Sequence, residues 1–389
     1  MTVQVGDERR YQFHSLISRE RLGGDKELFG NWTHAPIPPG CSAWDFSYRT
    51  VTFLDSQSLA PAPVASYPSL MTPPTQPTPT REATITCIQP GGGFCFSLES
   101  AWGRFRRGVL RALFPGYVRR MAALRQGACE NCPHDVIDPR DLKLVRNVCG
   151  YRFAPHDDAF AWRGRVGFAR AGLCELLVFS LVLVAPMLAC AALGVWHDWP
   201  WFIAAGVLLP VWLFILSFFR DPTRTIPTDA DALVSPADGT ITHIEEVEDA
   251  TFPGGRALRV SIFLSVFNVH VNRVPRAAKV TAVRYFPGEF LDARAGDCAV
   301  RNEQLWLELE DDALGIPIRI KQVSGAIARR IVCWLRVGES VSRGERLGMI
   351  KFGSRTDILV PAGSVAEVCV EVGQSVSGGS KVLLRLRGA

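Results

Sequence analysis

The stretch Ala257-Leu258-Arg259-Val260-Ser261-Ile262-Phe263 alternates apolar and polar side chains, and Lys279-Val280-Thr281-Ala282-Val283 repeats the pattern further along. Successive side chains of a β-strand point to opposite faces, so this alternation is typical of a strand with one buried face. Gly and Pro recur at short intervals around both stretches, as turns between strands require. We therefore predict that residues 221–389 form a mainly β domain.

An internal repeat near the C-terminus refines this prediction. Val337–Gly344 (VGESVSRG) recurs as Val372–Gly379 (VGQSVSGG), and an apolar strand follows each copy. The shared Gly-x-x-Val-x-x-Gly spacing predicts a turn, a buried valine and a second turn, as in the hairpins of flattened lipoyl-type or biotinyl-type barrels. A carrier would need a modifiable lysine at a hairpin tip, whereas the nearby Lys351 lies in a strand-like run. The repeat predicts a flattened β-barrel or sandwich with lipoyl-like hairpins, and it carries no function by itself.

Upstream of this domain, residues 171–219 contain no lysine or arginine, and their formal charges are Glu175 and Asp198. Two apolar runs, Leu173–Trp196 and Trp199–Phe219, are each about long enough to cross a hydrocarbon core. Tryptophans and a proline lie at the break, where an interfacial turn belongs, and arginines flank the pair on both outer sides. We predict a transmembrane helical hairpin over residues 166–220 with both ends cytoplasmic. A buried hairpin in a soluble core is the alternative.

Residues 1–165 form an extension of different composition. Proline-rich runs at 60–63 and 72–79 cannot donate a regular hydrogen-bond ladder, so they indicate a poorly ordered, extended chain. The stretch Trp102–Arg125 sets arginines among large apolar side chains. Such a stretch is typical of a helix on an anionic membrane surface or of an ordinary solvated helix, and both interpretations stay open. The predicted domains are therefore 1–165, 166–220 and 221–389.

Charge and cysteine content exclude two further classes of protein. A net charge of +5 over 389 residues is too small for a nucleic-acid binder, which would show a basic stripe. Eleven cysteines scattered through so long a chain do not form a disulfide scaffold. Cys129 and Cys132, with Cys149 and His156, have part of the spacing of a zinc site, but the second half is wider than usual. Reduced, unligated cysteines are the alternative.

Few residues of the β domain are suited to catalysis. Its two histidines are His243 and His270, and a proton shuttle at neutral pH would be one of them. His270 lies in an apolar strand, where a buried ring needs a polar partner, usually a carboxylate. Asp238 lies in a turn, and Gly353-Ser354 follows the strand-like run 347–352. Taken singly, each of these is typical of a turn or loop.

Taken together, these residues resemble a known family. Five motifs occur in a fixed order: Phe218–Pro222 (FFRDP), Val234–Gly239 (VSPADG), Val269–Pro275 (VHVNRVP), Arg301-Asn302-Glu303 and Phe352–Arg355 (FGSR). The set resembles the phosphatidylserine decarboxylases, in particular their short, membrane-anchored bacterial branch, over about residues 168–386. The first 165 residues have no counterpart in that resemblance.

The resemblance implies a zymogen that cuts itself between Gly353 and Ser354. The Ser354 hydroxyl would attack the Gly353 carbonyl, with His270 as the base and Asp238 orienting it. β-Elimination and loss of ammonia would then leave a pyruvoyl cofactor at residue 354. This group would form a Schiff base with phosphatidylserine and release phosphatidylethanolamine, a step of phospholipid biosynthesis. The resemblance implies no metal at this site.

It also implies partners and a location. The large chain 1–353 and the small chain 354–389 would stay together as a heterodimer or a higher oligomer. The catalytic domain would lie on the cytoplasmic face of the inner membrane, where it meets phosphatidylserine. Candidate substrate-binding residues are Arg273, Arg301, Asn302 and Glu303.

One departure from the longer family members leaves two roles open. Those members carry a second histidine where this chain has Arg273, so His270 would serve both cleavage and reprotonation, or share the work with water or another group. For Arg273, a contact with the lipid phosphate and a structural ion pair are both open.

Three other functions stand beside this reading. A membrane-anchored adaptor or carrier would keep an uncut chain. A zinc peptidase of the lysostaphin-like class needs a His-x-His pair, which His243 and His270 do not form. A decarboxylase of another anionic aminophospholipid belongs to the same class as the leading prediction.

Overall fold

The computed structural model describes residues 2–4, 10–12, 81–130, 132–294, 297–326, 330–351 and 353–388. The chain divides into two units, residues 1–69 and 70–389. In the first unit, strands β1 (Thr2–Gln4) and β2 (Arg10–Gln12) pair antiparallel. The proline-rich runs for which we predict poor order lie outside the described residues.

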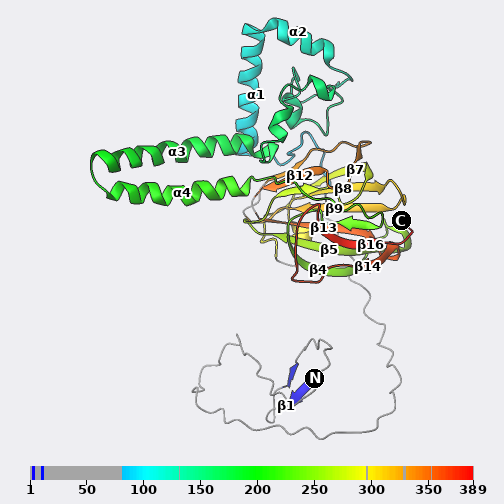
Figure 1. Cartoon of the computed structure of the whole chain (residues 1–389). Helices are drawn as coiled ribbons and strands as arrows, with labels where there is room; N and C mark the ends of the chain where they lie inside the picture. Colours follow the sequence, from blue (N-terminus) through cyan, green and yellow to red (C-terminus); the bar gives the residue numbers. More distant parts are fainter. Residues whose placement is uncertain are drawn as a thin grey trace, which may run out of the picture. The chain divides into compact units, whose positions relative to one another are not determined.

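In the second unit, described from residue 81, the first helices precede the β domain (Figure 1). Helix α1 (Phe94–Leu113) is followed directly by α2 (Pro115–Leu124), which starts with a proline, a residue suited to the first helical position. The predicted basic amphipathic stretch is therefore helical. Its apolar Trp102 and Phe105 are exposed, and Arg106 and Arg107 of the same helix contact Asp141. Contact of this apolar face with a membrane surface remains a prediction.

Residues between α2 and the hairpin are ordered by short helices and by contacts with the β domain. The 3₁₀ helices lie at Asp141–Leu144, Pro155–Asp157, Ala161–Gly164 and Arg170–Gly172. The backbone N–H of Cys333 donates to the Ile88 carbonyl, and Arg146 pairs with Glu339. Residues 81–165 are thus attached to the β domain, although the sequence placed them in a separate extension.

Two long apolar helices follow, α3 (Leu173–Trp196) and α4 (Pro200–Phe218), side by side and antiparallel (Figure 1). Both are long and apolar enough to cross a membrane, and 6% of either apolar window is buried in the protein. The indole N–H of Trp212 donates to Ser180 Oγ at 3.0 Å, which links the pair. The predicted hairpin is therefore present, and its exposure argues against the soluble-core alternative.

The β domain consists of three sheets, and all of its described strand pairs are antiparallel. The largest has eight strands in the order β11-β7-β8-β9-β13-β5-β4-β15, and three-stranded sheets β10-β12-β6 and β14-β16-β3 flank it. The strands are β3 (Ala232–Val234), β4 (Gly239–Glu248), β5 (Arg256–Leu264), β6 (Val271–Arg273), β7 (Ala278–Phe286), β8 (Gln304–Asp311), β9 (Pro317–Val323), β10 (Arg330–Cys333), β11 (Ser340–Val341), β12 (Arg346–Lys351), β13 (Ser354–Pro361), β14 (Val365–Val368), β15 (Ser375–Val376) and β16 (Val382–Leu386). Three further helices are short: Pro253–Gly255, α5 (Cys298–Arg301) and Ala362–Ser364. The mainly β fold and both alternating strands, which became β5 and β7, are confirmed.

The internal repeat occupies equivalent places in this architecture. β11 and β15 form the two edges of the eight-stranded sheet, and their valines, Val341 and Val376, are both buried. Each repeat begins and ends with a glycine of positive φ, between 77° and 90°, a conformation that side chains with a Cβ disfavour. The predicted order of turn, buried valine and turn is confirmed.

Two apolar clusters position the functional residues. The larger fills the barrel between the sheets. A second cluster lies at the N-terminal end of α3 and the C-terminal end of α4. Through Leu176, Phe218 and Phe219 it joins these helix ends to Val271 and Met349 of the β10-β12-β6 sheet. These two helix ends are therefore packed against β12, the strand that precedes Gly353.

Candidate active site

His270 lies between β5 and β6, immediately before Val271. Its Nδ1–H donates to the Asn268 carbonyl at 2.9 Å, and its Nε2 accepts from the Gly353 N–H at 3.2 Å. One nitrogen donates and the other accepts, so the ring is the neutral Nδ1–H tautomer. The predicted base is thus beside the predicted cleavage point.

The surroundings of His270 keep the ring uncharged. Its pKa is lowered to about 4, mainly by burial; the Asn268 hydrogen bond opposes this shift, and the positive charge of Arg220 adds a smaller lowering. The Phe218 ring at the end of α4 lies with its centroid 4.4 Å from that of the imidazole. A neutral imidazole can accept a proton, so His270 is suited to act as a base.

Gly353 forms the junction between β12 and β13, two strands of different sheets. Its φ is +61°, in the left-handed region that favours glycine. A Cβ built there would meet nothing closer than 3.9 Å, so the backbone conformation and not crowding requires glycine. Phe352, also part of the predicted motif, lies outside the described residues.

Ser354 is the first residue of β13 and pairs with Leu264 of β5. The residue is fully buried, and its Oγ has no hydrogen-bond partner among the described residues. A buried hydroxyl without a partner costs about 1–3 kcal/mol, so such groups are rare unless they have another role. This orphaned hydroxyl beside a glycine of positive φ fits a serine that is converted into another group.

A second glycine contacts the same peptide bond. A Cβ built on Gly325 would lie 2.4 Å from the Gly353 carbonyl oxygen, too close for any other residue type. Gly325 follows β9, and sequence reasoning missed it. The Ser324-Gly325 pair after a strand is the only signal, and it is indistinguishable from an ordinary turn.

Asp238 lies elsewhere in the hydrogen-bond network. Its two carboxylate oxygens accept from Arg224 at 2.7 and 2.8 Å, and one also accepts from the Gly378 N–H at 2.7 Å. Within the described part of the chain, no hydrogen bond joins Asp238 to His270. The orienting contact expected from Asp238 is made instead by the carbonyl of Asn268.

Arg273 is held by acceptors on three sides. Its guanidinium donates to Asp221 at 2.7 Å, to the Pro222 carbonyl at 3.0 Å and to the Gly344 carbonyl at 3.0 Å, and the residue is buried. Of the two interpretations left open, the structure contains the ion pair. Asp221 belongs to the motif after α4, so the pair fastens the end of the hairpin to β6.

The three remaining candidates are also engaged in structural contacts. Arg301 is half exposed and pairs with Glu289. The Asn302 side chain bonds the backbone of Leu291 and donates to the Ser324 carbonyl at 2.7 Å, next to Gly325. Glu303 accepts from the Tyr285 hydroxyl at 2.7 Å, and burial raises the pKa of its carboxyl group. A substrate-binding role for these residues remains a prediction.

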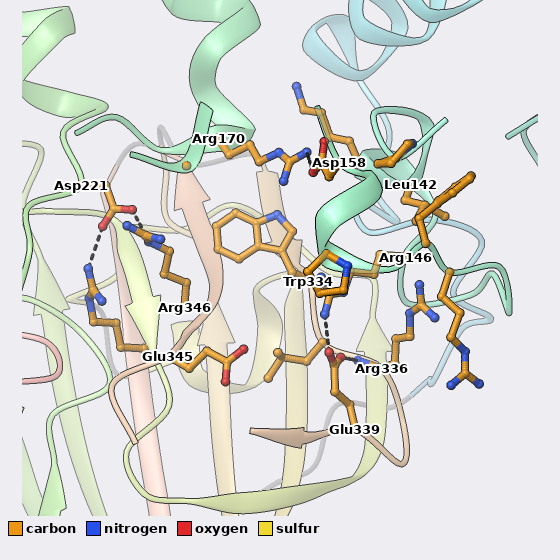
Figure 2. Close-up of a pocket in the computed structure, with 18 of the residues that line it drawn as sticks. Leu142, Arg146, Asp158, Arg170, Asp221, Trp334, Arg336, Glu339, Glu345 and Arg346 are labelled. Carbon is orange, nitrogen blue, oxygen red and sulfur yellow. Dashed lines mark hydrogen bonds and ion pairs between the residues drawn. The ribbon is translucent and has the colours of Figure 1, made fainter. Parts of the chain in front are cut away.

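A cavity of about 1010 Å³ lies between residues 139–170 and the β domain (Figure 2). Eight of its lining side chains are lysine or arginine and four are acidic, with Trp334 among them, so the cavity carries excess positive charge. Its lining includes Arg224 and Arg273 but none of Ser354, Gly353 and His270. The cavity suits an anionic group, and it is separate from the cleavage point.

Comparison with known proteins gives one consistent result. The family model described as phosphatidylserine decarboxylase matches residues 211–384. A phosphatidylserine decarboxylase proenzyme of Rhodopirellula baltica is 43% identical over 245 residues, which cover 63% of this chain and 98% of that protein. Proenzymes of the same name from Symbiobacterium thermophilum and Cupriavidus pinatubonensis are 45% and 44% identical, over 52% and 46% of this chain and 92% and 82% of those proteins.

Proposed function

The chain belongs to the phosphatidylserine decarboxylase family, and we propose that it converts phosphatidylserine to phosphatidylethanolamine with a pyruvoyl group made from its own Ser354. One observation carries the proposal: three features meet at a single peptide bond. They are the positive φ of Gly353, the unpartnered hydroxyl of Ser354 and the neutral His270.

Self-cleavage uses residues of this chain alone. The Ser354 hydroxyl attacks the Gly353 carbonyl carbon as His270 takes the hydroxyl proton. The proton passes to the nitrogen of residue 354 as the C–N bond breaks, which leaves an ester. A base then removes the Cα proton of residue 354, the Cβ–O bond breaks, and a Gly353 carboxylate and a dehydroalanine form. Water hydrolyses the latter to the pyruvoyl group and ammonia.

The groups around the bond suit the second half of the reaction as well. When present, the pyruvoyl carbonyl supplies an electron sink for loss of carbon dioxide. His270, once protonated, is placed to return a proton to the substrate carbon, and the apolar packing of Phe218 limits access of water. Asp238 acts indirectly in this scheme, because it holds Arg224 and the Gly378 turn.

The hairpin places this chemistry at a lipid surface. Phe218 at the end of α4 contacts His270, and Lys351, two residues before Gly353, pairs with Glu175 in the first turn of α3. The N-terminal end of α3 and the C-terminal end of α4 therefore both lie next to the proposed cleavage point. With arginines flanking the hairpin, we propose that α3 and α4 cross the inner membrane and that the β domain lies on its cytoplasmic face.

Intact-mass spectrometry of the purified protein tests the proposal. We expect two chains, 1–353 and 354–389, with the small one blocked at its N-terminus. Ser354→Ala should give one uncut chain without decarboxylase activity, whereas Ser340→Ala, at an exposed strand position, should be cut and active. An uncut wild-type chain with full activity, or an active Ser354→Ala variant, would refute the assignment.

A further inference from the structure

Three cysteine sulfurs converge in the segment between α2 and the hairpin, outside the residues 211–384 that the family model matches. The Sγ atoms of Cys129, Cys132 and Cys149 all lie within 4.8 Å of one another. The Cys132 and Cys149 sulfurs are 3.1 Å apart, about 1 Å longer than the ~2.05 Å of a disulfide bond. His156, the fourth ligand suggested by spacing, is 83% exposed at its side chain and faces Asp157 instead.

Backbone amides and an arginine lie beside these sulfurs. The Tyr151 N–H donates to Cys149 Sγ at 3.4 Å, and the Gly150 N–H donates to the Cys129 sulfur. Arg336 donates to the Tyr151 carbonyl at 2.9 Å, and its charge interacts with Cys149. Amide donors and a nearby cation would offset the negative charge that thiolate ligands carry when they bind a metal.

The two chain segments that carry the cysteines approach so closely that glycine is required on both. A Cβ built on Gly127 would lie 2.3 Å from the Gly150 carbonyl oxygen, and one built on Gly150 would lie 2.0 Å from the Ala128 carbonyl oxygen. The sulfurs are therefore brought together by backbone packing and not by chance rotamers of exposed side chains.

The apolar core around the cluster is small. Its fully buried members are Val136, Val145 and Cys149. So small an apolar core stabilises this segment little beyond its contacts with the β domain. A metal ion that joins residues 129–132 to residue 149 would supply the missing stabilisation, because binding energy at a structural site is folding energy.

We propose that Cys129, Cys132 and Cys149 bind a zinc ion, with the fourth position taken by water. Zinc prefers thiolate ligands in tetrahedral geometry, which sets the sulfurs about 3.8 Å apart at a Zn–S distance of ~2.3 Å. Binding releases three thiol protons and leaves a site of charge −1, which Arg336 offsets. The site is structural, and it does not depend on the proposed decarboxylation.

The proposed zinc site also lies next to residues that line the basic cavity. Arg152 and Phe153, which line the cavity, follow Cys149 by a few residues, and Arg146 precedes it. Loss of the metal should therefore loosen this wall and leave the cleavage point intact.

Metal analysis of the full-length protein, purified in detergent without a histidine tag from zinc-supplemented cells, tests the proposal. Inductively coupled plasma mass spectrometry should find about one zinc per chain. Cys129→Ser, Cys132→Ser and Cys149→Ser should each reduce zinc at least fivefold, whereas Cys369→Ser, a half-buried cysteine of the β domain, should retain it. Cleavage at 353/354 provides an internal check that each variant has folded.

A second measurement covers variants that fail to fold. The wild-type protein, stripped with a chelator and loaded with Co²⁺, should show the absorption of cobalt–thiolate charge transfer, and tryptic cleavage within residues 125–153 should rise at least fivefold when the metal is removed. Wild-type protein with no bound zinc would overturn the proposal. So would a mass 2 Da lower with two thiols recovered on reduction, which is the signature of a disulfide.

Discussion

His270, the proposed base, stays neutral because its ring is buried against Phe218. Its pKa of about 4 lies below the ordinary value, so between about pH 6.5 and 4 the unfolded chain binds a proton that the folded protein does not. Stability is therefore lost as the pH falls through this window, by about 3 kcal/mol at its lower end. Above it, the ring remains available to accept a proton.

Self-cleavage should follow the same titration. We expect the rate of cleavage of freshly synthesised precursor to stay constant from pH 8 to about 5 and to fall only as the pH approaches 4. A time course of chain cleavage on gels across this range measures it. His243→Gln, which changes an exposed histidine, should give the same profile. A midpoint near 6.5 would mean that His270 is solvated or is not the base.

Gly325 is the residue whose backbone lies against the scissile carbonyl. Alanine there would bring a Cβ to 2.4 Å from the Gly353 oxygen, so the β12–β13 junction must shift. Because a displacement of about 1 Å at a reacting group costs roughly 100-fold in rate, Gly325→Ala should slow cleavage by about that factor. Gly363→Ala, where a Cβ meets nothing within 4 Å, is the matched control. Equal cleavage rates for both variants would exclude a role for this close approach.

Residue types in the site could be predicted from the sequence, but their neighbours could not. Gly353, Ser354 and His270 stand in motifs, and the structure brings all three together. The backbone carbonyl of Asn268 orients the ring. Every residue has such a carbonyl, so the sequence does not indicate which one will make this contact. The family resemblance implies that orienting role for Asp238, whereas in this structure its carboxylate pairs with Arg224.

A buried ion pair joins strand β12 to helix α3. The side chains of Lys351 and Glu175 are 2% and 3% exposed. Lys351→Met would leave the Glu175 charge buried without a partner, so we expect a loss of about 3–5 kcal/mol in the free energy of unfolding. The double variant Lys351→Met with Glu175→Leu should recover most of it, because two apolar side chains replace the pair without an unpaired charge.

Denaturant unfolding in detergent micelles measures these changes. Arg294→Met, which removes an exposed pair with Asp292, should change stability by less than about 1 kcal/mol. If the double variant were as unstable as the sum of its single variants, the two side chains would not act as a pair.

Strands and the apolar hairpin could be predicted because their signals are local. Alternation over 257–263 identified β5, and the absence of cations over 171–219 identified α3 and α4. The attachment of residues 81–165 to the β domain could not be predicted, because it rests on contacts such as Ile88 with Cys333 that join distant parts of the chain. The order of strands within the sheet is hidden from local patterns for the same reason.

The small chain 354–389 would supply an interior strand of the largest sheet. Strand β13 pairs with β5 over eight residues and with β9 over five, and both partners belong to the large chain. Separation would break both ladders and expose apolar side chains such as Ile358 and Leu359. We therefore expect the two products to elute as one 1:1 complex in native size-exclusion chromatography and to separate only in denaturant. Recovery of a free small chain from native protein would contradict this arrangement.

The position of the α3 and α4 ends next to the proposed cleavage point has a kinetic consequence. An enzyme anchored in this way meets its lipid by lateral diffusion within the bilayer, and the lipid need not leave the leaflet. The turnover rate should then follow the mole fraction of phosphatidylserine in the surface and fall when inert lipid dilutes it, even where the amount of substrate per volume of suspension is unchanged. A hairpin that crosses the bilayer, as proposed, would confine the encounter of enzyme and lipid to the two dimensions of the membrane.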